Sequence, residues 1–210
     1  MGASSDSGVV IGEDGIARCW WADSAPEYRA YHDDEWGFPV ADDTRLFEKL
    51  TLEGFQAGLS WLTILRKRPA FRAAFADFDY ERVARFDEED VTRLLGDAGI
   101  IRHRGKIEAA INNASRALEL VEAEGSLASY VWRFEPEPRT GGLDREQLAA
   151  RTTSPEATAL AKDLKRRGWR FVGPTTVYAF MQAMGLVNDH LDGCAAQPRA
   201  RAARADFTPP

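Results

Sequence analysis

Residues 105–124 read G-K-I-E-A-A-I-N-N-A-S-R-A-L-E-L-V-E-A-E, and this stretch decides the fold class. Its apolar side chains recur at spacings of three and four residues, which places them on one face of a helix. The residues on this face are Ile107, Ala110, Ile111, Ala114, Ala117, Leu118 and Val121. The pattern predicts a long amphipathic helix with one side packed against a core.

Helix signals also occur before this stretch. Asp42 or Asp43 is placed to cap a helix, and residues 52–65 are apolar enough to form a buried one. Residues 78–95 predict two short helices, of which the second begins at Asp87 and has acidic residues in its first turn.

The same signals continue towards the end of the chain. Ser154 and Pro155 are typical of the start of a helix that extends to Arg167. Pro174 begins a last helix that ends near Met184, and no segment alternates convincingly as a strand. We therefore expect an all-α fold.

The chain has 210 residues, enough for one sizeable domain. Residues 1–16 are rich in glycine, serine and aspartate, and residues 196–210 lack a core-forming pattern. We therefore expect a disordered N-terminal tail and a flexible C-terminal tail around a single domain over residues 17–195. Proline and glycine predict a loop over residues 135–142.

The composition, 44 % hydrophobic, is ordinary for a soluble globular protein. No apolar run approaches the roughly 20 residues that span a bilayer, and the N-terminus lacks the features of a secretory signal. We expect a cytoplasmic protein with no membrane partner. The net charge of −6 argues weakly against nucleic acid, although binding depends on a local patch rather than on the total.

Four potential metal ligands fall into two pairs, one near each end of the ordered part. Cys19 and His32 form the first pair, and His190 and Cys194, within N-D-H-L-D-G-C, form the second. Structural zinc takes four nitrogen or sulfur ligands, often as two local pairs. On spacing alone, two buried cysteines and two surface histidines explain the pattern at least as well. A Cys19–Cys194 disulfide is less favoured in a reducing compartment.

Aromatic residues gather near the first pair. They are Trp20, Trp21, Tyr28, Tyr31 and Trp36, with Trp61 further on. Core packing explains most of them, although an enzyme that acts on a nucleobase also holds the base between aromatic faces. Glu53 stands in an apolar segment, where a carboxylate is costly to bury without partners. An interaction with the helix dipole is an equal explanation for it.

Residues 99–106, G-I-I-R-H-R-G-K, lie between two helical patterns. Backbone N–H groups of such a turn and the following helix N-terminus suit a phosphate. Its cationic side chains are Arg102, His103, Arg104 and Lys106. Taken alone, a solvated turn is the favoured explanation. A second basic run is better explained as a solvated helix face and comprises Lys162, Lys165, Arg166, Arg167 and Arg170.

Four longer motifs occur in a fixed order. They are A-Y-H-D-D-E-W-G-F-P (Ala30–Pro39), L-E-G-F-Q-A-G-L-S-W (Leu52–Trp61), D-A-G-I-I-R-H-R-G-K-I (Asp97–Ile107) and F-V-G-P-T-T-V-Y-A-F-M-Q-A-M-G-L-V-N-D-H (Phe171–His190). Together they closely resemble DNA-3-methyladenine glycosylase I, a family of helical base-excision repair enzymes. The resemblance extends from about Cys19 to Cys194 and is poorest over residues 135–153.

The resemblance implies one structural zinc per chain and a pocket for a flipped base. Its zinc ligands match Cys19, His32, His190 and Cys194. With four protein ligands, no position stays open for a catalytic water, so the metal would tie the termini together. Its aromatic pocket residues match Tyr31, Trp61, Trp21 and Tyr28. Its glutamate, which accepts hydrogen bonds from the base, matches Glu53, our candidate catalytic residue.

The resemblance also implies how DNA is held. The family's helix-hairpin-helix corresponds to the region near residues 87–124, in which Arg102, Arg104 and Lys106 are expected to face phosphate. Gly58 and Leu59 match the wedge that fills the gap left by the flipped nucleotide; a buried core leucine is the competing explanation for Leu59.

The implied activity is that of a monofunctional glycosylase, a monomer that excises N3-methyladenine from alkylated double-stranded DNA and releases 3-methyladenine. We find neither a lysine nucleophile for lyase chemistry nor an aspartate to stabilise the sugar cation. The alternative is a zinc-stapled DNA-binding module without catalysis. A glycosylase with an iron–sulfur cluster is nearly excluded, because such a cluster usually takes four cysteines and the chain has two.

Overall fold

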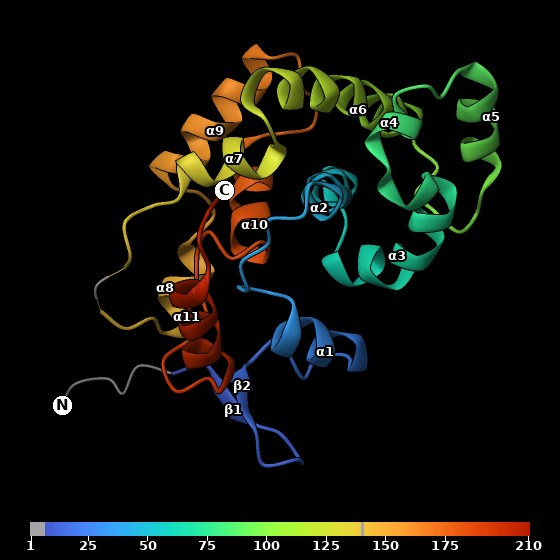
Figure 1. Ribbon diagram of the computed structural model, residues 1–210. Coiled ribbons are helices and arrows are strands. Elements are labelled where there is room, and N and C mark those ends of the chain that lie inside the picture. The colour runs from blue at the N-terminus through green and yellow to red at the C-terminus, as the bar shows by residue number, and fades with distance from the viewer. Residues whose placement is uncertain (1–6, 140) are drawn as a thin grey trace.

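The computed structural model describes residues 7–139 and 141–210, and this part of the chain is mostly helical (Figure 1). Its helices are α1 (Pro26–Asp34), α2 (Asp43–Gln56), α3 (Trp61–Ala74), α4 (Tyr80–Val83), α5 (Glu88–Gly96), α6 (Arg104–Glu124), α7 (Leu127–Val131), α8 (Arg145–Ala150), α9 (Pro155–Arg166), α10 (Pro174–Ala183) and α11 (Ala196–Asp206). Two 3-10 turns, η1 (Ala76–Phe78) and η2 (Trp132–Phe134), complete the helical elements. The predicted helical fold is confirmed.

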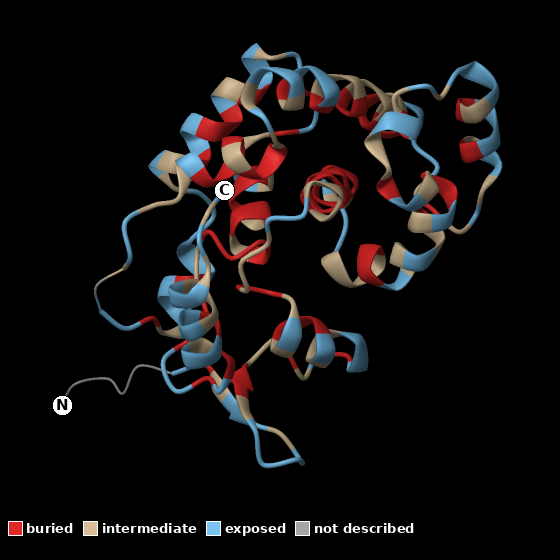
Figure 2. Ribbon diagram, in the orientation of Figure 1, coloured by how far each residue is buried: buried red, intermediate tan, exposed pale blue. Residues whose placement is uncertain are grey.

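Helix α2 forms the centre of the fold. Figure 1 shows it end-on with α3, α6, α7 and α10 around it, and Figure 2 shows that it is buried over most of its length. The Asp42 side chain begins the helix by accepting a hydrogen bond from the Arg45 backbone N–H at 2.8 Å. A helix enclosed on all sides must pair its polar side chains, which here include the buried Lys49 and Glu53.

Helix α6 confirms the expected amphipathic helix. Ile107, Ala110, Ala114 and Ala117 are buried on its core face. Leu118, expected on that face, is 37 % exposed because it lies at the edge of the apolar stripe. Ser154 caps α9 and Asp87 caps α5, both as expected.

The segment expected to be one buried helix over residues 52–65 is broken instead into α2 and α3. Gly58 adopts a left-handed backbone with φ of 80°, and Ser60 caps α3 by accepting from the Thr63 backbone N–H at 3.2 Å. The break places residues 57–60, all exposed, on a surface turn between the two helices.

Both ends of the described chain are more regular than expected. Strands β1 (Val9–Ile11) and β2 (Ala17–Cys19) form an antiparallel pair, and α11 lies in the segment expected to be a flexible tail. These strands were missed because three residues cannot display an alternation. Residues 1–6 of the expected N-terminal tail and residue 140 of the expected loop lie outside the described residues. The division into one domain and two tails stays a prediction.

A hydrogen bond joins the two ends of the described chain. The Ala195 backbone N–H donates to the Ala17 carbonyl oxygen at 2.8 Å, which brings β2 beside the segment before α11. A small apolar cluster surrounds this junction and includes Cys19, Leu143, Leu191 and Cys194. Among the described residues, no helix has the length and apolarity needed to cross a membrane.

Candidate metal centre and base pocket

The two cysteine–histidine pairs converge at this junction. Cys19 ends β2, His32 lies in the last turn of α1, and His190 and Cys194 belong to the turn that precedes α11. All four side chains are buried, and one potential ligand atom from each lies within 4.8 Å of the others. Segments far apart in the sequence have therefore built a Cys2His2 cluster that could hold a metal ion.

The spacing within the cluster suits tetrahedral coordination. Nδ1 of His190 lies 3.2 Å from Nε2 of His32. Sγ of Cys194 lies 3.4 Å from Nε2 of His32 and 3.6 Å from Nδ1 of His190. Ligand bonds of about 2.0–2.3 Å in a tetrahedron separate ligand atoms by roughly 3.3–3.8 Å. The spacing of these three ligand atoms is close to that range, and Sγ of Cys19 completes the cluster 3.9 Å from Nδ1 of His190.

The other ring nitrogen of each histidine has its own partner. His32 Nδ1 lies 2.7 Å from Oδ1 of Asp33, and His190 Nε2 lies 2.8 Å from the carbonyl oxygen of Trp36. Such contacts fix the ring orientation and leave one defined nitrogen facing the cluster. The Leu191 backbone N–H also donates to Sγ of Cys19 at 3.4 Å, as it would to a thiolate.

An open cavity of about 220 Å³ lies beside the metal cluster. Its walls come from Trp21, Tyr28, Tyr31, Trp36, Glu53, Gln56, Trp61, Ala179 and Gln182. All five expected pocket residues, the four aromatics and Glu53, are therefore brought together. Trp36 lines the cavity as well and packs edge-on against His190 with centroids 4.7 Å apart.

The cavity has the dimensions and chemistry of a site for a flat aromatic ligand. The Tyr31 and Trp61 rings lie 5.4 Å apart, and Trp21 stands edge-on to Tyr28 at 5.5 Å. Glu53, only 5 % exposed, adds a carboxylate to these aromatic walls. A planar ligand can stack on a ring and direct its polar edge to the carboxylate.

Comparisons with known proteins agree with this geometry. A sequence model described as methyladenine glycosylase matches residues 21–197. The chain is 49 % identical to DNA-3-methyladenine glycosylase 1 of Escherichia coli (strain K12), with 87 % of this chain and 98 % of the relative covered. The chain belongs to the methyladenine glycosylase family. 

Solved structures support this assignment to the methyladenine glycosylase family. A crystal structure of 3-methyladenine DNA glycosylase I has a TM-score of 0.81 at 51 % identity and covers 86 % of this chain and 100 % of its own. The Staphylococcus aureus enzyme, described in terms of its recognition of 3-methyladenine, has a TM-score of 0.80 at 39 % identity and covers 86 % and 96 %.

Lys49 contacts the pocket residues of this methyladenine glycosylase from behind, and sequence reasoning missed it. Its Nζ lies 2.7 Å from Oε1 of Glu53, 2.8 Å from the Tyr31 hydroxyl and 3.2 Å from the centroid of the Trp61 ring. Burial lowers the pKa of Lys49 to about 8, against the opposing effect of Glu53. The signal available in the sequence was the four-residue spacing of Lys49 and Glu53 within an apolar helix.

Gln56 and Gln182 are further polar wall residues that the motifs did not single out. Gln182 donates from Nε2 to Oδ2 of Asp189 at 2.9 Å, which orients its side chain. Asp189 is itself buried and also accepts from the Tyr178 hydroxyl at 2.6 Å. The amide of Gln182 is therefore held in place by α10 and the loop that carries His190.

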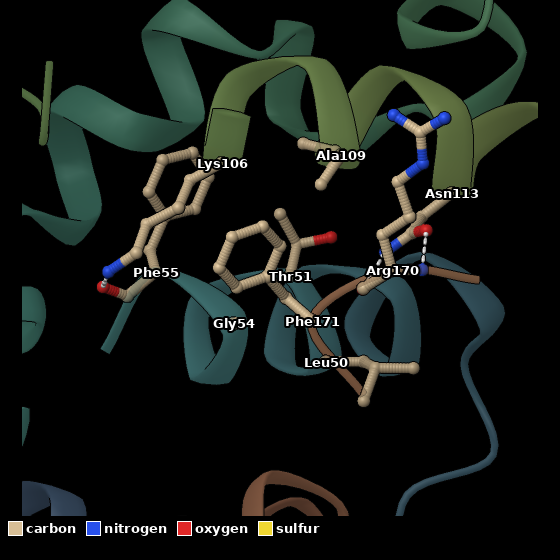
Figure 3. Close-up of a pocket in the computed structure, with 10 residues that line it drawn as sticks. Leu50, Thr51, Gly54, Phe55, Lys106, Ala109, Asn113, Arg170 and Phe171 are labelled. Atoms are coloured by element: carbon tan, nitrogen blue, oxygen red, sulfur yellow. Dashed lines mark hydrogen bonds between the residues drawn. The ribbon is translucent and has the colours of Figure 1, made fainter. Parts of the chain in front are cut away.

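The ammonium group of Lys106, expected to face phosphate, is buried against the end of α2. Its Nζ donates to the carbonyl oxygens of Phe55 at 2.9 Å and Ala57 at 2.6 Å, and the side chain is 8 % exposed (Figure 3). Helix C-termini leave carbonyl groups unpaired and attract cations, so Lys106 completes the end of α2. Burial lowers the pKa of Lys106.

The other cationic side chains of the turn, those of Arg102, His103 and Arg104, are exposed. His103 caps α6, because its Nδ1 accepts from the Lys106 backbone N–H at 3.2 Å. Arg104 pairs with Glu88 at 2.7 Å, and Arg102 makes no ion pair with any described residue. The Arg102 guanidinium is therefore the most available cationic group of the turn.

Leu59 is 42 % exposed on the turn between α2 and α3, so the competing explanation of a buried core leucine is wrong. The second basic run behaves as a solvated face. Arg166 and Arg167 both pair with Asp163, and Lys162 and Lys165 are exposed.

Proposed function

We propose that the protein is a monofunctional DNA glycosylase that flips N3-methyladenine out of alkylated double-stranded DNA and excises it, which initiates base-excision repair. The observation that carries this proposal is the cavity that five aromatic side chains line together with one buried carboxylate. The relatives named above are DNA-3-methyladenine glycosylases, hydrolases of N-glycosyl bonds. We further propose that the enzyme acts as a monomer in the cytoplasm.

The cavity residues suit a flipped, methylated adenine. Chemistry on a base within a duplex requires that the nucleotide leave the stack. An adenine methylated at N3 in DNA is cationic, and each aromatic face adds cation–π attraction worth about 0.5–2 kcal/mol. The carboxylate of Glu53 can accept a hydrogen bond from the exocyclic amine of the base. Because the cationic base is already a good leaving group, binding that favours the separated base lowers the barrier.

We propose that the Cys2His2 cluster holds one zinc ion. Its support is the donor set, the spacing of the four ligand atoms and the outer partners of both histidines. With Cys19, His32, His190 and Cys194 as ligands, the ion would supply cross-linking of the two chain ends and no reaction chemistry. Its binding energy would add to folding.

We propose that DNA lies across α5, α6 and the turn between them, as in a helix-hairpin-helix. Arg102, Arg104 and the N-terminus of α6 are the phosphate-binding groups in this proposal. Gly58 and Leu59 would form the wedge, which the exposure of Leu59 at the α2–α3 turn supports. Lys106 contributes by fixing α6 to the end of α2 and not by contacting phosphate.

Arg102 and Lys106 offer a matched test of this surface. Arg102→Ala should weaken binding to damaged and undamaged duplexes about equally and reduce the salt slope by about 1, because phosphate contacts carry no sequence information. Lys106→Met should leave that slope unchanged but lower the free energy of unfolding by roughly 1–3 kcal/mol, because two buried carbonyl groups lose their donor. Salt titrations and chemical denaturation measure the two effects. A reduced salt slope in Lys106→Met would contradict this assignment.

A DNA-binding module without catalysis is the competing function. It would use the same basic turn and metal centre but would leave damaged bases in place. Glu53 within the aromatic cavity favours the enzyme. Release of free 3-methyladenine from alkylated DNA by the purified protein distinguishes the two.

A further inference from the structure

The buried ammonium group of Lys49 touches three of the proposed base-binding residues and has no role in the function described so far. Its Nζ lies 2.7 Å from Oε1 of Glu53 and against the face of the Trp61 ring. Lys49 as a whole is only 5 % exposed. Glu53 and Trp61 line the cavity, and Lys49 lies behind them. This location suits a residue that positions its neighbours. It does not suit a nucleophile, which would have to reach the sugar outside the pocket.

We propose that Lys49 orients the Glu53 carboxylate, holding one of its oxygens so that the other is available to the base. The proposal rests on the proposed role of Glu53 as the acceptor for the flipped base. It assigns Lys49 a part in base recognition that acts through Glu53 and Tyr31 and not through contact with the base.

The first argument is the cost of burying the carboxylate. Glu53 is 5 % exposed and shares the cavity walls with five aromatic side chains, surroundings in which a carboxylate is costly to bury without a partner. A cation in direct contact offsets that cost. Lys49 lies one turn earlier on the same helix, so α2 itself fixes the pair.

The second argument is that the other charges near Lys49 are already paired. Arg68 of α3 holds Glu35, which follows α1, through two hydrogen bonds of 2.6 Å and 2.8 Å. From α10 the cavity receives only the uncharged Ala179 and Gln182. Within the described chain, Lys49 alone forms a salt bridge with Glu53. Removal of this ammonium group would leave the carboxylate without a cationic partner.

The third argument is the second hydrogen bond of Lys49. Its ammonium group donates to the Tyr31 hydroxyl oxygen at 2.8 Å. Tyr31 therefore accepts from Lys49 and keeps its own O–H for another acceptor. One lysine thus orients both a carboxylate acceptor and a phenolic donor on the same cavity wall.

The test compares the full-length wild type with Lys49→Met, Lys49→Gln and Lys49→Arg. The probe is free 3-methyladenine, titrated by tryptophan fluorescence between pH 6.5 and 8.5. At pH 6.5 the Met and Gln variants should bind roughly tenfold more weakly than the wild type. The wild type should weaken towards these variants as the pH rises to 8.5, because the Lys49 ammonium group, with a pKa of about 8, loses its proton over this range. Lys49→Arg should keep, within about threefold, the affinity that the wild type has at pH 6.5 across the whole range, because a guanidinium group stays charged throughout.

The pH profile separates this role from a merely structural one. Lys49→Gln keeps a donor without the charge, so it decides the question even if Lys49→Met does not fold. Profiles of the Met and Gln variants that run parallel to the wild type would overturn the proposal. In a Glu53→Gln background, Lys49→Gln should produce no pH-dependent change, because no carboxyl group remains.

The same titration distinguishes failure of this inference from failure of the proposed function. Wild-type binding by Glu53→Gln would remove Glu53 from the base site, and with it the function assigned to the pocket. Weak binding by Glu53→Gln together with unchanged pH profiles in the Lys49 variants would reject the role of Lys49 alone.

Discussion

Replacing Cys194 with serine is expected to lower the free energy of unfolding by about 4 kcal/mol or more, the scale on which proteins lose a bound structural metal. For a chain of this length, that corresponds to a fall in Tm of roughly 8–16 °C. The physical reason is that the Cys2His2 cluster joins β2 and α1 to the segment before α11. Without a fourth ligand, the proposed zinc ion would no longer close the loop between these elements.

Differential scanning calorimetry and elemental analysis of the same preparations measure this effect. Ala196→Ser is the matched control, since it adds a hydroxyl to the same buried cluster without touching a ligand. It should keep one zinc per chain and most of the stability. Freshly purified, folded wild type without zinc would contradict the metal assignment. The Cys194→Ser protein that stays folded should retain the base selectivity of the wild type.

Glu53→Gln and Trp61→Ala are expected to lose ten- to a hundredfold in affinity for free 3-methyladenine. The glutamine replaces one acceptor oxygen with a donor that would face the adenine amine, and a mispaired buried polar group costs about 1–3 kcal/mol. The alanine removes stacking worth about 1–3 kcal/mol per base. Both variants should bind undamaged duplex almost normally, because the proposed phosphate contacts lie on the α5–α6 turn.

Single-turnover excision and titration of the free base measure these losses. Glu48→Gln is the matched control for Glu53→Gln: Glu48 is equally buried on α2 but pairs with Arg72 at 2.9 Å, away from the cavity walls. Residual excision should persist in every variant because the cationic base departs readily. Wild-type values for Glu53→Gln in both measurements would leave the aromatic cluster as core.

The features predicted well from the sequence are those with a local signal. The apolar face of α6, the Asp87 cap of α5 and the Ser154 cap of α9 are each contained in a few consecutive residues. The metal cluster and the cavity needed more, because their residues meet only when distant segments pack. The family motifs supplied that information, and the structure brings those residues together.

The features that sequence reasoning missed depend on tertiary contacts. Helix α11 has few large apolar residues, but Arg204 pairs with Glu135 through two hydrogen bonds of 2.6 Å each. Lys106 lies in a basic turn, which suggested phosphate, yet the end of α2 offers its ammonium group two carbonyl oxygens. The surroundings of Lys49 depend on two other helices, because α1 contributes Tyr31 and α3 contributes Trp61 to the contacts of its ammonium group.

The most direct test of the central claim is base release from alkylated DNA. Purified wild-type protein is incubated with DNA treated with a methylating agent, the released bases are separated by chromatography, and the DNA is assayed for strand breaks before and after alkali. We expect free 3-methyladenine in solution and abasic sites that break only on alkaline treatment, with release reduced in Glu53→Gln. Protein that binds this DNA but releases no methylated base would contradict the claim that the aromatic cavity is the active site of a glycosylase.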